Sequence, residues 1–127
     1  MPALLPDSDS AVLRTALADP ARDRVVVCYC AAWCDTCSAY RVKFDALADA
    51  QPNTLFIWVD IEDHAEWLGE EDVENFPTLS VRHGERHVFF GPMLPHIGHL
   101  ERLLDSLNAD SAEVPTKLPD WARLQAA

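Results

Sequence analysis

The sequence predicts an α/β domain in which one central mixed β-sheet is flanked by α-helices. Two almost wholly apolar runs, residues 24–30 and 54–61, are typical of central strands buried on both faces. Two further extended runs lie on either side of Gly84 and Glu85, which indicates a β-hairpin. Because a helical pattern separates the first two strands, they should pair in parallel through a right-handed crossover, and the hairpin should add antiparallel strands.

The predicted helices come from apolar residues repeated at helical spacing. A first helix is expected after the Asp- and Ser-rich residues 7–10, with a stop at Asp19 and Pro20. Residues 34–50 carry one apolar stripe and end before Gln51 and Pro52, so they predict a long amphipathic helix. Residues 63–74 indicate a short acidic helix with Asp63 as a candidate cap, and residues 95–108 indicate a final helix.

Length and charge limit the kind of protein. A chain of 127 residues with 49% apolar content suits one compact domain, which we place at residues 1–108. Residues 109–127 are polar and interrupted by prolines, so we expect a C-terminal tail that Trp121 pins to the body. The net charge of −11 argues against nucleic acid or an anionic membrane as a partner.

The apolar runs are far shorter than the roughly 20 residues of a membrane helix. The first ten residues lack the basic flank and apolar stretch of an export signal. We therefore expect a cytoplasmic protein, in a compartment where thiols are normally kept reduced.

All four cysteines fall within residues 28–37. Cys34 and Cys37 form a C-x-x-C motif that follows a buried strand and opens a helix. Unpaired N–H groups and the helix dipole at such a position favour a thiolate, which is the nucleophile in disulfide exchange. We therefore expect a catalytic pair in which Cys34 attacks a disulfide and Cys37, on the first helical turn, resolves the mixed disulfide.

The other two cysteines, Cys28 and Cys30, lie two apart on a predicted strand. Their α-carbons should be about 6.6 Å apart with parallel side chains, so we expect no disulfide between them. Ordinary buried thiols are the preferred interpretation; a regulatory third thiol and a four-sulfur metal site are the alternatives. Because one pair lies inside a strand, we predict no metal ligand.

With these features the chain resembles the thioredoxin family over roughly residues 5–108. The matching segments are residues 25–37 (VVVCYCAAWCDTC), 58–63 (WVDIED), 75–81 (NFPTLSV), Gly84, and 89–93 (FFGPM). The resemblance implies the thioredoxin fold and a cis peptide bond before Pro77 that faces the cysteine pair. It also implies that substrates dock over five residues: Trp33, Phe76, Pro77, Gly91 and Pro92.

The same resemblance implies reduction of disulfide-containing protein substrates without a bound cofactor. Electrons would come from a donor similar to thioredoxin reductase or from a low-molecular-weight thiol. The alternative is a thioredoxin-fold binding or scaffold module with weak or no redox turnover.

The chain departs from the family around the cysteine pair. Asp35 and Thr36 replace the Gly-Pro of typical thioredoxins, and the charge of Asp35 should disfavour a thiolate at Cys34 and so favour a reductant, or else stabilise the helix N-terminus. Cys28 stands where thioredoxins bury a carboxylate, and Trp58 replaces the opposing lysine. The usual proton relay is therefore missing, and Asp60 is the candidate substitute. We expect ionisation of the pair to be tuned by Asp35, Thr36, Cys28 and Asp60.

Overall fold

The computed structural model describes residues 3–19 and 24–121. Its sheet has the strand order β2-β1-β3-β4. Strand β1 (Arg24–Cys30) pairs in parallel with β2 (Thr54–Asp60) and antiparallel with β3 (Thr78–His83), which pairs antiparallel with β4 (Arg86–Pro92). The predicted mixed sheet and its hairpin are confirmed, and Gly84 has the positive φ of 60° that the hairpin turn requires.

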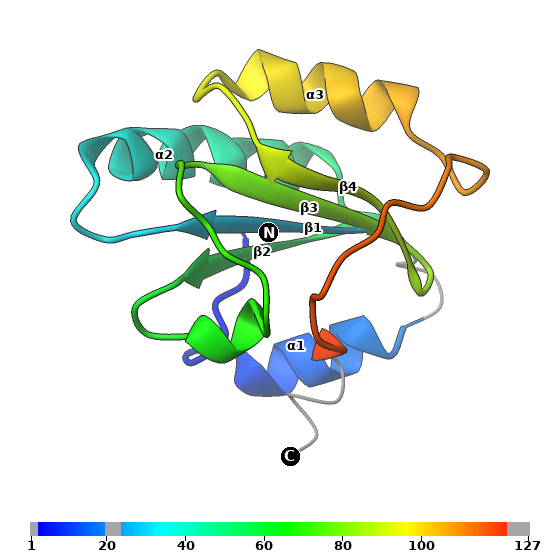
Figure 1. Ribbon diagram of the computed structural model, residues 1–127, viewed down its shortest axis with the longest axis horizontal. Helices are drawn as coiled ribbons and strands as arrows, with labels where there is room; N and C mark the ends of the chain where they lie inside the picture. The colour runs from blue at the N-terminus through cyan, green and yellow to red at the C-terminus, as the bar shows by residue number, and fades with distance from the viewer. Residues whose placement is uncertain (1–2, 20–23, 122–127) are drawn as a thin grey trace.

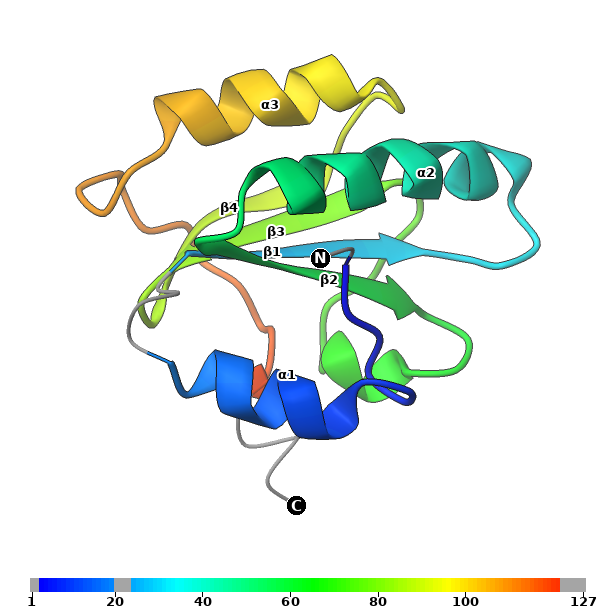
Figure 2. The ribbon, with the colours of Figure 1, turned by 180° about the vertical axis from the view of Figure 1, so that it is seen from behind.

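Helices cover both faces of this sheet (Figures 1 and 2). Helices α2 (Asp35–Ala50) and α3 (Ile97–Ser106) lie on one face, and α1 (Ser10–Leu17) lies on the other. Alternate residues of β1 pack into two separate hydrophobic cores, because successive side chains of a strand point to opposite faces of the sheet. Val26, Cys28 and Cys30 pack under α2 and α3, whereas Val25, Val27 and Tyr29 pack toward α1.

The predicted acidic helix over residues 63–74 is wrong except for one short turn. The structure has only a 3₁₀-helix, η1 (Ala65–Trp67), whose N-cap is His64 and not Asp63. Gly69 follows with a φ of 59°, a left-handed conformation that ends the helical path. The acidic residues after Gly69 repel one another, which disfavours a continued helix. The conformation of this segment is instead decided by the tertiary contacts of Trp67 and Leu68, which are both buried.

Segments from both ends of the chain protect the edges of the sheet. Leu4 forms a parallel bridge with Ile57 beside β2, and the N–H of Val114 donates to the carbonyl of His87 in β4 at 2.8 Å. These bonds occupy backbone groups that an open edge would leave exposed. None of the helices in the described residues is long and apolar enough to cross a membrane.

The tail belongs to the folded body, as the sequence predicted for Trp121. The Trp121 side chain is 0% exposed and stacks on Trp67 with ring centroids 5.9 Å apart. Its Nε1 donates to the Trp67 carbonyl oxygen at 3.2 Å, and Tyr29 donates to the same oxygen at 3.0 Å. The tail thus packs beside η1 on the face of the sheet opposite to α2 (Figure 1), where the sequence had predicted a longer acidic helix.

Candidate active site

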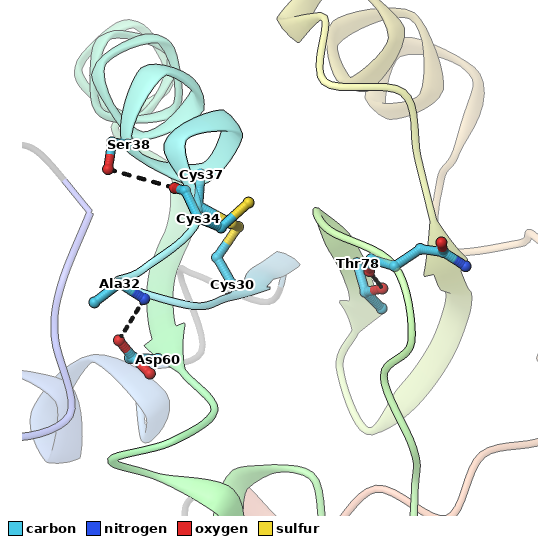
Figure 3. Close-up of a disulfide and its surroundings, with 8 residues drawn as sticks. Cys30, Ala32, Cys34, Cys37, Ser38, Asp60 and Thr78 are labelled. Carbon is cyan, nitrogen blue, oxygen red and sulfur yellow. Dashed lines mark hydrogen bonds between the residues drawn. A yellow bond between two sulfur atoms is a disulfide. The ribbon is translucent and has the colours of Figure 1, made fainter.

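Three cysteines gather where β1 ends and α2 begins (Figure 3). Cys30 is the last residue of β1, Cys34 is the N-cap of α2, and Cys37 lies in the first turn of that helix. A disulfide joins Cys30 to Cys37, with their α-carbons 5.8 Å apart. Cys34 is a free thiol with intermediate exposure. The site therefore combines a buried disulfide with an accessible thiol beside it.

This pairing corrects the expectation that Cys30 is an ordinary core thiol. In this structure the partner of Cys37 is Cys30, and the disulfide expected between Cys34 and Cys37 is not formed. The reason is tertiary: α2 folds back over β1, and this places the first helical turn above the end of the strand, within the usual span of a disulfide. The sequence shows that Cys30 and Cys37 are seven residues apart, but strand and helix periodicity do not indicate that the two side chains meet.

Backbone hydrogen bonds hold the connection between Cys30 and Cys34. Asp60 lies opposite Cys30 in β2, and its carboxylate accepts the N–H of Ala32 at 2.9 Å (Figure 3). The same carboxylate accepts the N–H of Glu62 at 2.9 Å. The carbonyl of Cys34 accepts the N–H of Ser38 at 3.2 Å, which fixes Cys34 as the helix N-cap. Asp60 thereby positions the turn that carries the free thiol.

Below the site the core is apolar. Cys28 is fully buried opposite Trp58, and burial raises the pKa of its thiol well above the ordinary value. Burial also raises the pKa of the nearby Tyr40 hydroxyl, an effect to which Cys28 adds. Phe44 packs on the Trp58 ring. Among the described residues, the buried polar side chains are Thr54, Thr78 and Ser80, with no carboxylate and no lysine, so this core offers Cys37 no efficient base from below.

The residues expected to bind substrate lie together at the end of the sheet. The Trp33 side chain is 66% exposed and meets Phe76 edge to face, with ring centroids 5.7 Å apart. The Phe76–Pro77 peptide bond is cis. The Pro77 carbonyl accepts the N–H of Met93 at 3.0 Å, which holds the end of β4 against this segment. Gly91 and Pro92 lie there, in register with Leu79 and Thr78.

A pocket of about 470 Å³ lies beside Cys37, on the side of the N-terminal segment. Cys37 and the Asp60 carboxylate both line it, together with Ser38 and Arg41. His64 closes part of the rim: its Nε2 is 3.1 Å from Asp7 and its Nδ1 is 3.1 Å from Glu66. This polar group leaves no pattern in the sequence, because Asp7 meets His64 only through the tertiary fold. The pocket joins Cys37 to a region that water and protons can reach.

His64 should make the stability of the protein depend on pH. Burial by itself would lower the pKa of His64, but hydrogen bonds and charges of Glu66 and Asp7 outweigh it and raise the pKa. A raised folded-state pKa adds stability that is complete below about pH 6.5 and is lost as pH rises through the folded-state value. We therefore expect His64→Gln to lower the free energy of unfolding more at pH 5.5 than at pH 8 in urea titrations.

His87 supplies a control of opposite sign. Burial and then the charge of Arg82 lower the pKa of His87, so this group destabilises the fold as pH falls below about 6.5. Accordingly, His87→Gln should lower the free energy of unfolding less at pH 5.5 than at pH 8. An equal loss at both pH values for His64→Gln would contradict the assigned role of His64.

In the described part of the chain, no group of three or more His, Cys, Asp or Glu side chains is arranged to hold a metal ion. The fold and the cysteine geometry define a class: an α/β domain with a redox cysteine cluster at the strand-to-helix junction. Residues 8–90 match the family model described as Thioredoxin. The chain belongs to the thioredoxin family.

Individual relatives match only part of this chain. The thioredoxin of Oryctolagus cuniculus is 38% identical over 62 residues, which are 48% of this chain and 59% of that protein. A putative thioredoxin H10 of Arabidopsis thaliana is 38% identical over 55 residues, or 43% of this chain and 36% of its own length. These matches span less than two thirds of either relative.

Solved structures show the same fold. Thioredoxin O1 from Arabidopsis thaliana in the oxidized state superposes with a TM-score of 0.64 at 20% identity, covering 84% of this chain and 98% of that one. Fasciola hepatica thioredoxin gives a TM-score of 0.64 at 23% identity, covering 76% and 91%. At such identities the likeness establishes the thioredoxin fold alone.

Proposed function

We propose that this protein is a thiol–disulfide oxidoreductase that reduces protein disulfides through Cys34 and Cys37. The observation that carries the proposal is the free, partly exposed Cys34 at the N-terminus of α2, directly beside a disulfide that already contains Cys37. A helix N-terminus stabilises a thiolate. A scaffold has no need of a nucleophilic sulfur and a bonded cysteine pair at one junction.

The reaction starts from the reduced protein, in which the electron donor has broken the Cys30–Cys37 disulfide and both Cys34 and Cys37 are thiols. It then has two exchange steps. The Cys34 thiolate attacks one sulfur of the substrate disulfide, forms a mixed disulfide and releases the other substrate sulfur as a thiolate. The Cys37 thiolate then attacks the Cys34 sulfur, and the second substrate sulfur leaves. The substrate gains two electrons, the protein loses two, and solvent protonates the released thiolates.

Proton removal from Cys37 is the step in which this chain differs from the usual relay. Asp60 lines the same pocket as Cys37, and two backbone N–H groups hold its carboxylate. We assign it the part of a base acting through pocket water. Asp35 and Thr36 are both exposed at the start of α2, where Asp35 contributes a negative charge and Thr36 a hydroxyl group near Cys34.

The proposed substrates are extended segments of disulfide-containing proteins. The exposed Trp33, which precedes Cys34, packs edge to face on the partly exposed Phe76; Pro77 follows as a buried residue, and Gly91 and Pro92 border this segment. The donor would be an enzyme similar to thioredoxin reductase or a small thiol. A cytoplasmic setting fits this chemistry, since cytosolic disulfides are usually transient and catalytic.

Reduction of insulin, followed by turbidity with dithiothreitol as donor, tests the proposal. The wild type should accelerate precipitation, and Cys34→Ser should return the rate to the dithiothreitol background. Val42→Ala, which changes an exposed side chain on the same helix, is the matched control and should keep the wild-type rate. A wild-type rate equal to background would support the scaffold alternative instead.

A further inference from the structure

We infer that Cys37 exchanges partners between Cys34 and Cys30, so that the disulfide made during substrate reduction moves inward and Cys34 is released as a free thiol. The inference rests on the proposed function for the origin of the disulfide. It adds a third cysteine, Cys30, to the reaction and a resting form of the oxidised protein.

The positions of the sulfurs allow both bonds. The α-carbons of Cys30 and Cys37 are 5.8 Å apart, and the disulfide between them is formed. Cys34 is the N-cap of α2 and Cys37 lies in the first turn three residues later, so both thiols lie at the same end of the helix. Cys37 therefore reaches either partner, but its single sulfur bonds only one at a time.

Burial sets the direction of the exchange. Cys30 is 0% exposed and Cys37 is 1% exposed, whereas Cys34 is partly open to solvent at a helix N-terminus. A charged sulfur costs more in the apolar core than at the surface. Cys34, which solvent reaches, is therefore a better leaving group than the buried Cys30, so the disulfide is expected to accumulate between Cys30 and Cys37.

The step balances without an added oxidant. The Cys30 sulfur attacks the Cys37 sulfur, and the proton of the Cys30 thiol passes to solvent by way of the departing Cys34 sulfur. The bond between Cys34 and Cys37 breaks, the bond between Cys30 and Cys37 forms, and Cys34 leaves as a thiolate. The number of disulfides stays at one. Cys28 takes no part: it lies in the same core on the same face of β1 but remains a free thiol.

The exchange gives the oxidised protein two properties. It keeps an accessible nucleophile, Cys34, while its disulfide is out of reach of large reductants. Reduction of the buried bond by a protein donor must then begin with the reverse exchange through Cys34. A protein without Cys34 should therefore neither form nor lose this bond at the normal rate.

Peptide mapping with chymotrypsin separates the possible bonds, because cleavage after Tyr29, Trp33 and Tyr40 places Cys28, Cys30 and the Cys34/Cys37 pair on different peptides. Reduced protein is oxidised with glutathione disulfide, quenched with acid at intervals, alkylated and digested. We expect the first product to be peptide 34–40 closed by an internal Cys34–Cys37 disulfide, here called the internal loop. It should then convert to a cross-link between residues 30–33 and 34–40, reaching at least a tenfold excess, roughly the preference that burial gives.

Two cysteine variants on β1 form a matched pair. Cys30→Ala should stop at the internal loop, whereas Cys28→Ala, an equally buried change two residues away, should still form the cross-link. Cys34→Ala should form the cross-link at least about tenfold more slowly, since the buried thiols lack access to the disulfide reagent.

A wild type that ends with the internal loop and an alkylated Cys30 would overturn the inference. Formation of the cross-link at the wild-type rate in Cys34→Ala would also overturn it. The insulin assay is a separate readout: a wild type that forms the cross-link through Cys34 but does not reduce insulin would support the exchange and overturn the proposed function.

Discussion

Trp121→Ala is expected to lower the free energy of unfolding by about 3–5 kcal/mol, the usual cost of removing a large buried aromatic side chain. The indole is fully buried between Trp67, on which it stacks, and His87, whose ring meets it at right angles with centroids 5.3 Å apart. The change leaves a cavity and removes a donor to the Trp67 carbonyl. Urea denaturation followed by circular dichroism measures the loss.

Two further variants separate the cavity from the hydrogen bond. Trp121→Phe keeps most of the packing and loses the Nε1 donor, but Tyr29 still donates to the Trp67 carbonyl, so a loss of about 1–2 kcal/mol is expected. Trp33→Ala removes an exposed indole and should cost less than about 1 kcal/mol. If Trp121→Ala were no worse than Trp33→Ala, the tail would not be part of the core.

Cys37→Ser is expected to trap the substrate on Cys34 and to reduce insulin turnover at least about 100-fold, because the first exchange step survives and the resolving sulfur is lost. Cys34 is partly exposed and Cys37 is buried behind it, so substrate reaches Cys34 alone. Mass spectrometry without a reductant should show one substrate chain joined to Cys34 by a mixed disulfide.

The corresponding control is Cys34→Ser with Cys37 intact, which should form no mixed disulfide. Cys30 is the remaining sulfur that could replace Cys37, so Cys37→Ser is compared with the double variant Cys30→Ala/Cys37→Ser. Equal trapping in both is expected, since Cys30 is buried under the helix. Wild-type turnover by Cys37→Ser would show that Cys37 is not the resolving thiol.

Sequence patterns were sufficient for the architecture. The apolar runs at 24–30 and 54–61 and the amphipathic stretch at 34–50 agree with β1, β2 and α2 to within one residue at each end. Each of these patterns has a local physical cause: a strand buried on both faces is apolar along its whole length, and a helix buried along one stripe repeats apolar residues at helical spacing. The hairpin followed in the same way from Gly84, whose backbone conformation few other residues adopt.

The acidic segment after β2 shows where local patterns failed. Helical spacing over residues 63–74 gave one turn of 3₁₀-helix, because Gly69 packs against the tail, with the Lys117 carbonyl 3.0 Å from the place of a Cβ. No local pattern contains that contact, since residues 69 and 117 are far apart in the chain.

For the cysteine cluster, too, local sequence patterns determined some features and tertiary contacts determined others. The sequence alone determined that a C-x-x-C pair opens a helix after a buried strand, since position at a helix N-terminus is a local property. Only the tertiary structure decided that Cys37 bonds to Cys30, that Asp60 holds the intervening turn and that His64 and Asp7 border the same pocket. These pairings depend on how α2 and the N-terminal segment pack against the sheet, and packing between distant elements leaves no period in the sequence.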